Sequence, residues 1–141
     1  MRSLFDVNFL IALLQPDHVH HQQAQSWWEA NESDGWASCP LTENGFARVV
    51  AQTGPRPLTA AAALRFLSEQ VASTNHAFWP DDISLTDTDF FRFDRILGPK
   101  QLTDIYLLGL AVRNDGRLAT FDRSISALAV KGAERRHLIV V

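Results

Sequence analysis

The chain has 141 residues, close to the usual size of one domain, so we expect one core and a single domain over residues 1–141. Hydrophobic residues make up 46% and charged residues 21% of the chain, which excludes the disordered, collagen-like and coiled-coil classes. The net charge of −3 argues against a protein that binds nucleic acid through bulk charge.

The first part of the chain alternates between strand and helix patterns. Residues 2–5 predict a short strand that ends at Asp6, and apolar residues then recur at helical spacing over residues 9–14. A second amphipathic helix is expected over residues 20–30. A turn signal follows it, and residues 36–39 predict the second strand.

The middle of the chain continues the pattern. A helical run over residues 43–50 stops before a loop at residues 54–57 that is rich in proline and glycine. Residues 59–72 predict a further helix with Thr59 as its N-cap, and residues 76–79 predict the third strand.

The last part contains the clearest helical spacing, over residues 104–112. Strands are expected at residues 117–121 and 138–141, with a helix-like segment over residues 124–130 between them. The whole order favours an α/β fold with a mostly parallel central sheet flanked by helices on both faces.

The sequence also predicts a cytoplasmic protein. The single cysteine, Cys39, cannot form an intramolecular disulfide and suits a reducing compartment. The apolar run at residues 9–14 is far shorter than the ~20 residues that a membrane helix needs. A signal peptide is the alternative because Arg2 precedes this run, but Asp6 and Asn8 interrupt it and no small-residue cleavage site follows. We therefore expect neither export nor a membrane partner.

Four carboxylates fall on one predicted edge of the sheet. Asp6 and Asp122 close two strands, and Glu43 and Asp104 open two helices. The carboxyl ends of parallel strands meet at one edge, where ligands bind. Singly, each acid is explained by helix capping or by the helix dipole. Together, like charges near 4 Å apart repel by on the order of a few kcal/mol per pair. A hard cation, Mg²⁺ or Mn²⁺, would neutralise them.

The same residues carry a resemblance to a known family. The segments Asp6-Val7-Asn8-Phe9-Leu10-Ile11-Ala12-Leu13, Thr42-Glu43, Thr103-Asp104-Ile105-Tyr106-Leu107-Leu108-Gly109-Leu110-Ala111 and Thr120-Phe121-Asp122-Arg123 resemble, in order, the four conserved blocks of PIN domains, particularly of VapC-type toxins. Many members carry a further acid shortly after the last aspartate, where this chain has Ser124 and Ile125, so a fifth carboxylate is not expected.

The resemblance implies a metal-dependent ribonuclease that is the toxin of a toxin–antitoxin pair. It implies that Asp6, Glu43, Asp104 and Asp122 are the catalytic acids and metal ligands, that a VapB-like antitoxin inhibits the enzyme, and that the chain forms a homodimer. We assign Asp6 and Asp104 as central ligands and the other two acids as completing ligands. In such a site the cations activate water and stabilise charge on the phosphate.

Two residues near the predicted acids in the sequence, Asn8 and Thr120, are candidates to assist the metal site. Asn8 follows Asp6 by two residues, so its amide either holds a water at the site or caps the following helix. Thr120 is interpreted as a strand residue rather than as a phosphate donor.

Other features are weaker signals. His18, His20 and His21 crowd a turn, but no second cluster with ligand spacing accompanies them, so we reject a zinc site. Trp27 and Trp28 are expected to pack in the core or to line a groove for a partner helix.

The segment from Arg113 to His137 carries six basic and three acidic residues, a net charge of +3, and could meet a phosphate backbone.

Three other functions are alternatives for the same acidic residues and fold: a flap-endonuclease-like DNA nuclease, a non-catalytic PIN-like module that binds RNA or a partner, and a receiver-like signalling domain. The lone Asp6 and the position of Lys131 disfavour the receiver.

Overall fold

The computed structural model of the chain describes residues 1–54 and 57–141. In chain order its strands and α-helices are β1 (Ser3–Phe5), α1 (Val7–Leu14), α2 (His21–Asn31), β2 (Trp36–Ser38), α3 (Pro40–Gln52), α4 (Ala60–Ser73), β3 (His76–Phe78), α5 (Leu102–Arg113), β4 (Arg117–Thr120) and β5 (Leu138–Val140). Within the described ranges, no helix is both long and apolar enough to cross a membrane.

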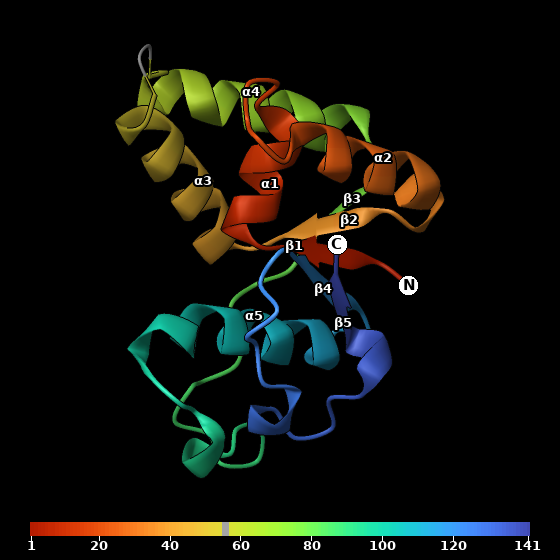
Figure 1. Cartoon of the computed structure of the whole chain (residues 1–141), viewed down its shortest axis with the longest axis vertical. Coiled ribbons are helices and arrows are strands. Elements are labelled where there is room, and N and C mark those ends of the chain that lie inside the picture. The colour runs from red at the N-terminus through yellow and green to blue at the C-terminus, as the bar shows by residue number, and fades with distance from the viewer. Residues whose placement is uncertain (55–56) are drawn as a thin grey trace.

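The five strands form one parallel sheet in the order β3-β2-β1-β4-β5. Helices α1 to α4 lie on one side of this sheet and α5 lies on the other (Figure 1). The predicted α/β class, with a parallel sheet covered on both faces, is therefore confirmed. The chain winds from β1 out to β3 and then returns to place β4 on the other side of β1. Ligands bind parallel sheets at such a reversal, so the gap beyond the ends of β1 and β4 is the favoured site.

Two hydrophobic clusters fill the space on either side of the sheet. Successive strand residues point to opposite faces, so Leu4 and Leu118 pack on the α5 side. Phe5 and Ala119 pack on the other side, with the helices that cover it. Both clusters contain fully buried side chains from the strands and helices, so the strand ends are held between two packed layers.

Local capping explains where three helices begin. Asp6 is the N-cap of α1, and its side chain accepts a hydrogen bond from the backbone N–H of Phe9. Thr59 caps α4 in the same way, as predicted, by accepting from the backbone of Ala62. Helix α3 begins earlier than its apolar spacing predicts, because Pro40 occupies a first-turn position that tolerates proline.

The elements differ from the prediction in several places. Residues 124–130 do not form a helix-like segment of that length; a single 3₁₀ turn spans Ala127–Ala129. Glu43 is the fourth residue of α3 and Asp104 the third residue of α5, so each lies in the first turn of its helix and not at its first position. In the predicted loop at residues 54–57, Pro55 and Arg56 lie outside the described residues.

Candidate active site

Asp6 is the most deeply buried of the four predicted acids. Only 4% of its surface is exposed, since it lies at the junction between β1 and α1. Its Oδ1 accepts a 2.6 Å hydrogen bond from the Phe9 backbone N–H, and its Oδ2 accepts a 2.5 Å bond from the Thr120 hydroxyl. Burial raises the pKa of Asp6, these two hydrogen bonds oppose the rise, and the charge of Asp122 adds to it.

Thr120 joins two of the predicted acids. Its side chain is fully buried at the end of β4. The hydroxyl oxygen donates to Asp6 and accepts a 2.9 Å hydrogen bond from the Asp122 backbone N–H. Thr120 is therefore a strand residue, as predicted, and its hydroxyl is used inside the protein to connect the two strand ends.

Asp122 follows β4 by two residues and is more exposed than Asp6. Its Oδ1 accepts hydrogen bonds of 2.7 Å from both the backbone N–H and the hydroxyl of Ser124. These bonds lower the pKa of Asp122. Asp122 is thus held as a carboxylate whose other oxygen accepts no hydrogen bond from the described residues.

Asp104 is the third aspartate at this end of the sheet. Burial, followed by the charges of Asp6 and Asp122, raises its pKa to about 6. Asp6, which follows β1, and Asp122, which follows β4, therefore act electrostatically on Asp104 in α5. Gln101, which precedes α5, ties this arrangement together because its Nε2 donates a 3.1 Å hydrogen bond to the Ser124 carbonyl. The sequence carried no signal for Gln101.

Glu43 has different surroundings. Its Oε1 accepts a 2.7 Å hydrogen bond from the Ser38 hydroxyl, which also lies 2.8 Å from His76 Nε2. Ser38 has one proton to donate, so the His76 nitrogen is the donor to Ser38. No contact within the described ranges links Glu43 to the three aspartates. Sequence reasoning missed this Ser38–His76 support because its two members come from different strands.

Asn8 lies in the first turn of α1 with its side chain exposed. The helix is capped by Asp6, so the interpretation of Asn8 as the helix-cap amide is wrong. Its amide instead faces solvent two residues from the most buried aspartate.

The chemistry of the three aspartates fits a hard divalent cation. They offer only oxygen donors, and their repulsion, which raises the pKa of Asp104, is relieved by positive charge. As the side chains stand in residues 1–54 and 57–141, no three His, Cys, Asp or Glu residues are gathered closely enough to enclose an ion. The aspartates are therefore related by the Thr120 hydroxyl between Asp6 and the Asp122 backbone, and by the charges that act on Asp104.

Two arginines of the basic segment from Arg113 to His137 already have partners within the protein. Arg117 is largely buried, contacts Asp34 at 3.3 Å and lies 5.4 Å over the ring of Trp27. Arg136 is paired with Glu134 and Asp115. Arg117 is therefore engaged in contacts within the fold, and Arg136 in ion pairs at the surface.

Comparison with known proteins shows the family to which the chain is similar. Residues 3–131 match the family model described as PIN domain, a range that contains all four predicted acids. The chain is 46% identical over 139 residues to Ribonuclease VapC44 of Mycobacterium tuberculosis, covering 98% of each chain. It is 44% identical over 131 residues to Ribonuclease VapC38 (90% of this chain, 89% of the relative) and 39% identical over 134 residues to Ribonuclease VapC39 (94% and 96%), both of the same organism.

Proposed function

This chain belongs to the PIN-domain family, and we propose that it is a Mg²⁺- or Mn²⁺-dependent endoribonuclease that acts as the toxin of a toxin–antitoxin pair. The observation that carries the proposal is the group of Asp6, Asp104 and Asp122 beyond the ends of β1 and β4, with the raised pKa of Asp104. The relatives are named ribonucleases, which favours RNA over DNA as the substrate. We assign this activity to one domain over residues 1–141.

The acids have separate roles in this proposal. Asp6 and Asp104 are the central metal ligands because they are the two whose ionised forms are least stabilised by the protein itself. Asp122 completes the group, and Glu43 is the fourth ligand, with Ser38 fixing the position of one of its oxygens. A bound divalent cation would activate water for attack and stabilise charge on the phosphate.

Two further residues support the acids. Thr120 holds Asp6 and the Asp122 backbone in one arrangement through a single hydroxyl, so it is a positioning residue. Asn8 is exposed beside the site, and we assign its amide to hold a water or a phosphate oxygen of the substrate. Neither residue carries a charge of its own.

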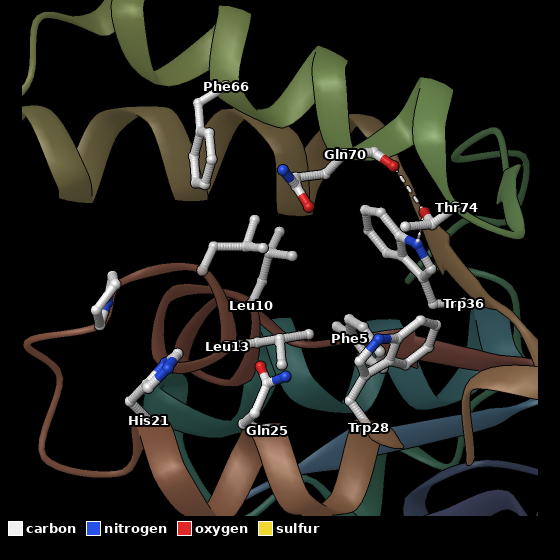
Figure 2. A pocket seen from close by; sticks show the side chains of 12 residues that line it. Phe5, Leu10, Leu13, His21, Gln25, Trp28, Trp36, Phe66, Gln70 and Thr74 are labelled. Atoms are coloured by element: carbon white, nitrogen blue, oxygen red, sulfur yellow. Dashed lines mark hydrogen bonds between the residues drawn. The ribbon is translucent and has the colours of Figure 1, made fainter. Parts of the chain in front are cut away.

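The proposed antitoxin docks on an apolar pocket between α1, α2 and α4. The pocket has a volume of about 260 Å³ and is lined by Phe5, Leu10, Leu13, Leu14, Pro16, His21, Gln25, Trp28, Trp36, Phe66, Gln70 and Thr74. Figure 2 shows Phe66 and Gln70 of α4 facing Leu10 and Leu13 of α1. An amphipathic helix of a VapB-like partner suits such a groove, because its apolar residues would cover these side chains.

Only one of the two predicted tryptophans lines this pocket. Trp28 does so and also meets the ring of Phe5 edge-on at 5.9 Å. Trp27, which is also partly buried, packs instead against Phe9 and beneath Arg117. Trp28 is therefore the docking residue in this proposal, and Trp27 is a packing residue.

Two further parts of the proposal concern assembly and location. A homodimer is expected from the family resemblance, and sedimentation of the purified chain tests it. We place the reaction in the cytoplasm, where cellular RNA is present and where the free, buried thiol of Cys39 stays reduced.

Incubation of the purified protein with a pool of cellular RNAs tests the proposed reaction. We expect discrete cleavage products with Mg²⁺ or Mn²⁺ and none in chelator, and end-sequencing of the products identifies the cut sites. Cleavage of flap DNA but not of RNA would favour the flap-endonuclease-like alternative. Binding of RNA without cleavage in either cation would favour the non-catalytic module.

A further inference from the structure

Four rings form a continuous series from the interior beside Asp6 to the protein surface. Phe9 lies 5.3 Å from Phe121, Phe121 lies 5.0 Å from His20, and His20 lies 5.8 Å from His18, all measured between ring centroids. Phe9 is fully buried, Phe121 is half-buried and His20 is exposed. We call these four residues the ring ladder.

The inner end of the ring ladder is attached to the acids. Phe9 donates its backbone N–H to Asp6, and Phe121 stands in the chain between Thr120 and Asp122. The ladder therefore begins at the two strand ends that carry the candidate site. His20, the third ring of the ladder, contacts Phe121, and Phe121 directly precedes Asp122 in the chain.

The segment that carries the outer rings is held in place before any ligand binds. His18 Nδ1 accepts a 3.0 Å hydrogen bond from the His20 backbone N–H, which orients the His18 ring. The ring of His21 contacts the Ala12 carbonyl through Nδ1 at 2.8 Å, which anchors the start of α2 to α1. A binding surface that is ordered in advance pays little entropy on binding.

The rings of His18 and His20 are inclined by 42° and are not stacked face to face. His20 is itself exposed, so its ring is open to solvent one ring contact from Phe121, the residue before Asp122. Packing alone does not require an aromatic ring at an exposed position. Proteins that bind unpaired RNA stack its bases on such rings, including histidine and phenylalanine.

We propose that the ring ladder is a stacking platform on which His20 receives an unpaired nucleobase of the RNA substrate next to the scissile phosphate. This inference rests on the proposed ribonuclease function and adds a substrate-positioning residue to it, the exposed His20. The bases of a continuous duplex are stacked on one another and do not offer a free face to His20.

Steady-state cleavage of a short single-stranded RNA that contains one mapped cut site tests the platform. His20→Ala removes the ring, His20→Phe keeps an aromatic ring without its nitrogen atoms, and Val19→Ala, at a neighbouring position that is 86% exposed, is the matched control. We expect His20→Ala to raise KM about tenfold, equivalent to ~1.4 kcal/mol, with kcat nearly unchanged. His20→Phe should restore most of the loss, and Val19→Ala should match the wild type.

A second measurement reports stacking directly. With 2-aminopurine placed beside the cut site, the wild type and His20→Phe should quench its fluorescence and His20→Ala should not. An unchanged KM for His20→Ala would overturn the platform, as would equal losses in the alanine and phenylalanine variants, because the imidazole nitrogens would then be the groups that matter. Cleavage of duplex RNA as fast as of single-stranded RNA would also overturn it. If the wild type cleaves no RNA at all, the proposed function fails instead.

Discussion

Replacing Asp104 with asparagine should make the metal-free protein more stable. The pKa of Asp104 is about 6 in the fold against 3.8 for an unperturbed aspartate. That difference makes the ionised carboxylate less stable in the fold than in the unfolded chain, by at most about 3 kcal/mol. The asparagine amide must itself be buried and part of the carboxylate still contacts solvent, so we expect a gain of about 1 kcal/mol, or about 3 °C in melting temperature for a chain of this size.

The gain should depend on pH in a definite direction. A carboxyl group whose pKa is raised in the fold favours folding when it is protonated, and this contribution is lost as the pH rises through the folded pKa. Near pH 4 and below, Asp104 is protonated in the fold, so wild type and Asp104→Asn should melt at similar temperatures. The difference should develop between pH 4 and pH 6 and be complete at pH 7.

Thermal melts in chelator at several pH values, followed by melts at neutral pH with Mn²⁺, measure both effects. Added Mn²⁺ should stabilise the wild type more than Asp104→Asn, because the substitution removes a ligand. Asp17→Asn, at an exposed position in the segment between α1 and α2, is the control and should shift neither quantity. If Asp104→Asn melts lower than the wild type without metal and both proteins gain equally from Mn²⁺, Asp104 is an ordinary helix-start acid and the site assignment is wrong.

Three further outcomes are expected. RNA cleavage should require Mg²⁺ or Mn²⁺ and leave 5′-phosphate and 3′-hydroxyl ends, because water is the nucleophile; mass spectrometry showing 2′,3′-cyclic phosphate ends would contradict this. Asp6→Asn should lower kcat by several orders of magnitude in a protein that still folds, whereas His18→Ala should change kcat little; equal losses of kcat in both would point to a histidine-based site. Trp28→Ala should weaken the complex with a co-expressed antitoxin, since Trp28 lines the pocket, whereas Trp27→Ala should lower the melting temperature without weakening the complex of the folded protein; an unchanged Kd for folded Trp28→Ala would discard this docking surface.

The order of elements and the edge that carries the acids were predictable from the sequence. Hydrophobic spacing and turn residues depend on nearby positions in the chain, as the N-cap of α4 at Thr59 illustrates. Once strands and helices alternate, the handedness of their connections makes the sheet parallel and gathers the strand ends at one edge. This is why Asp6, Asp104 and Asp122 could be assigned to the same edge before the fold was known.

The relations between those residues depended on tertiary contacts. Thr120 donates to Asp6 across 114 positions in the sequence, and the Ser38–His76 contact joins two strands that are 38 positions apart. Within residues 124–130 a 3₁₀ turn spans only Ala127–Ala129, although the spacing predicts a longer helix. Such features depend on which surfaces pack together, and burial in turn sets the pKa of Asp104. Periodicity in the sequence indicates how a segment can fold locally. The protonation state and the orientation of a side chain depend instead on residues distant in the sequence, because these determine its solvent exposure and its hydrogen-bond partners.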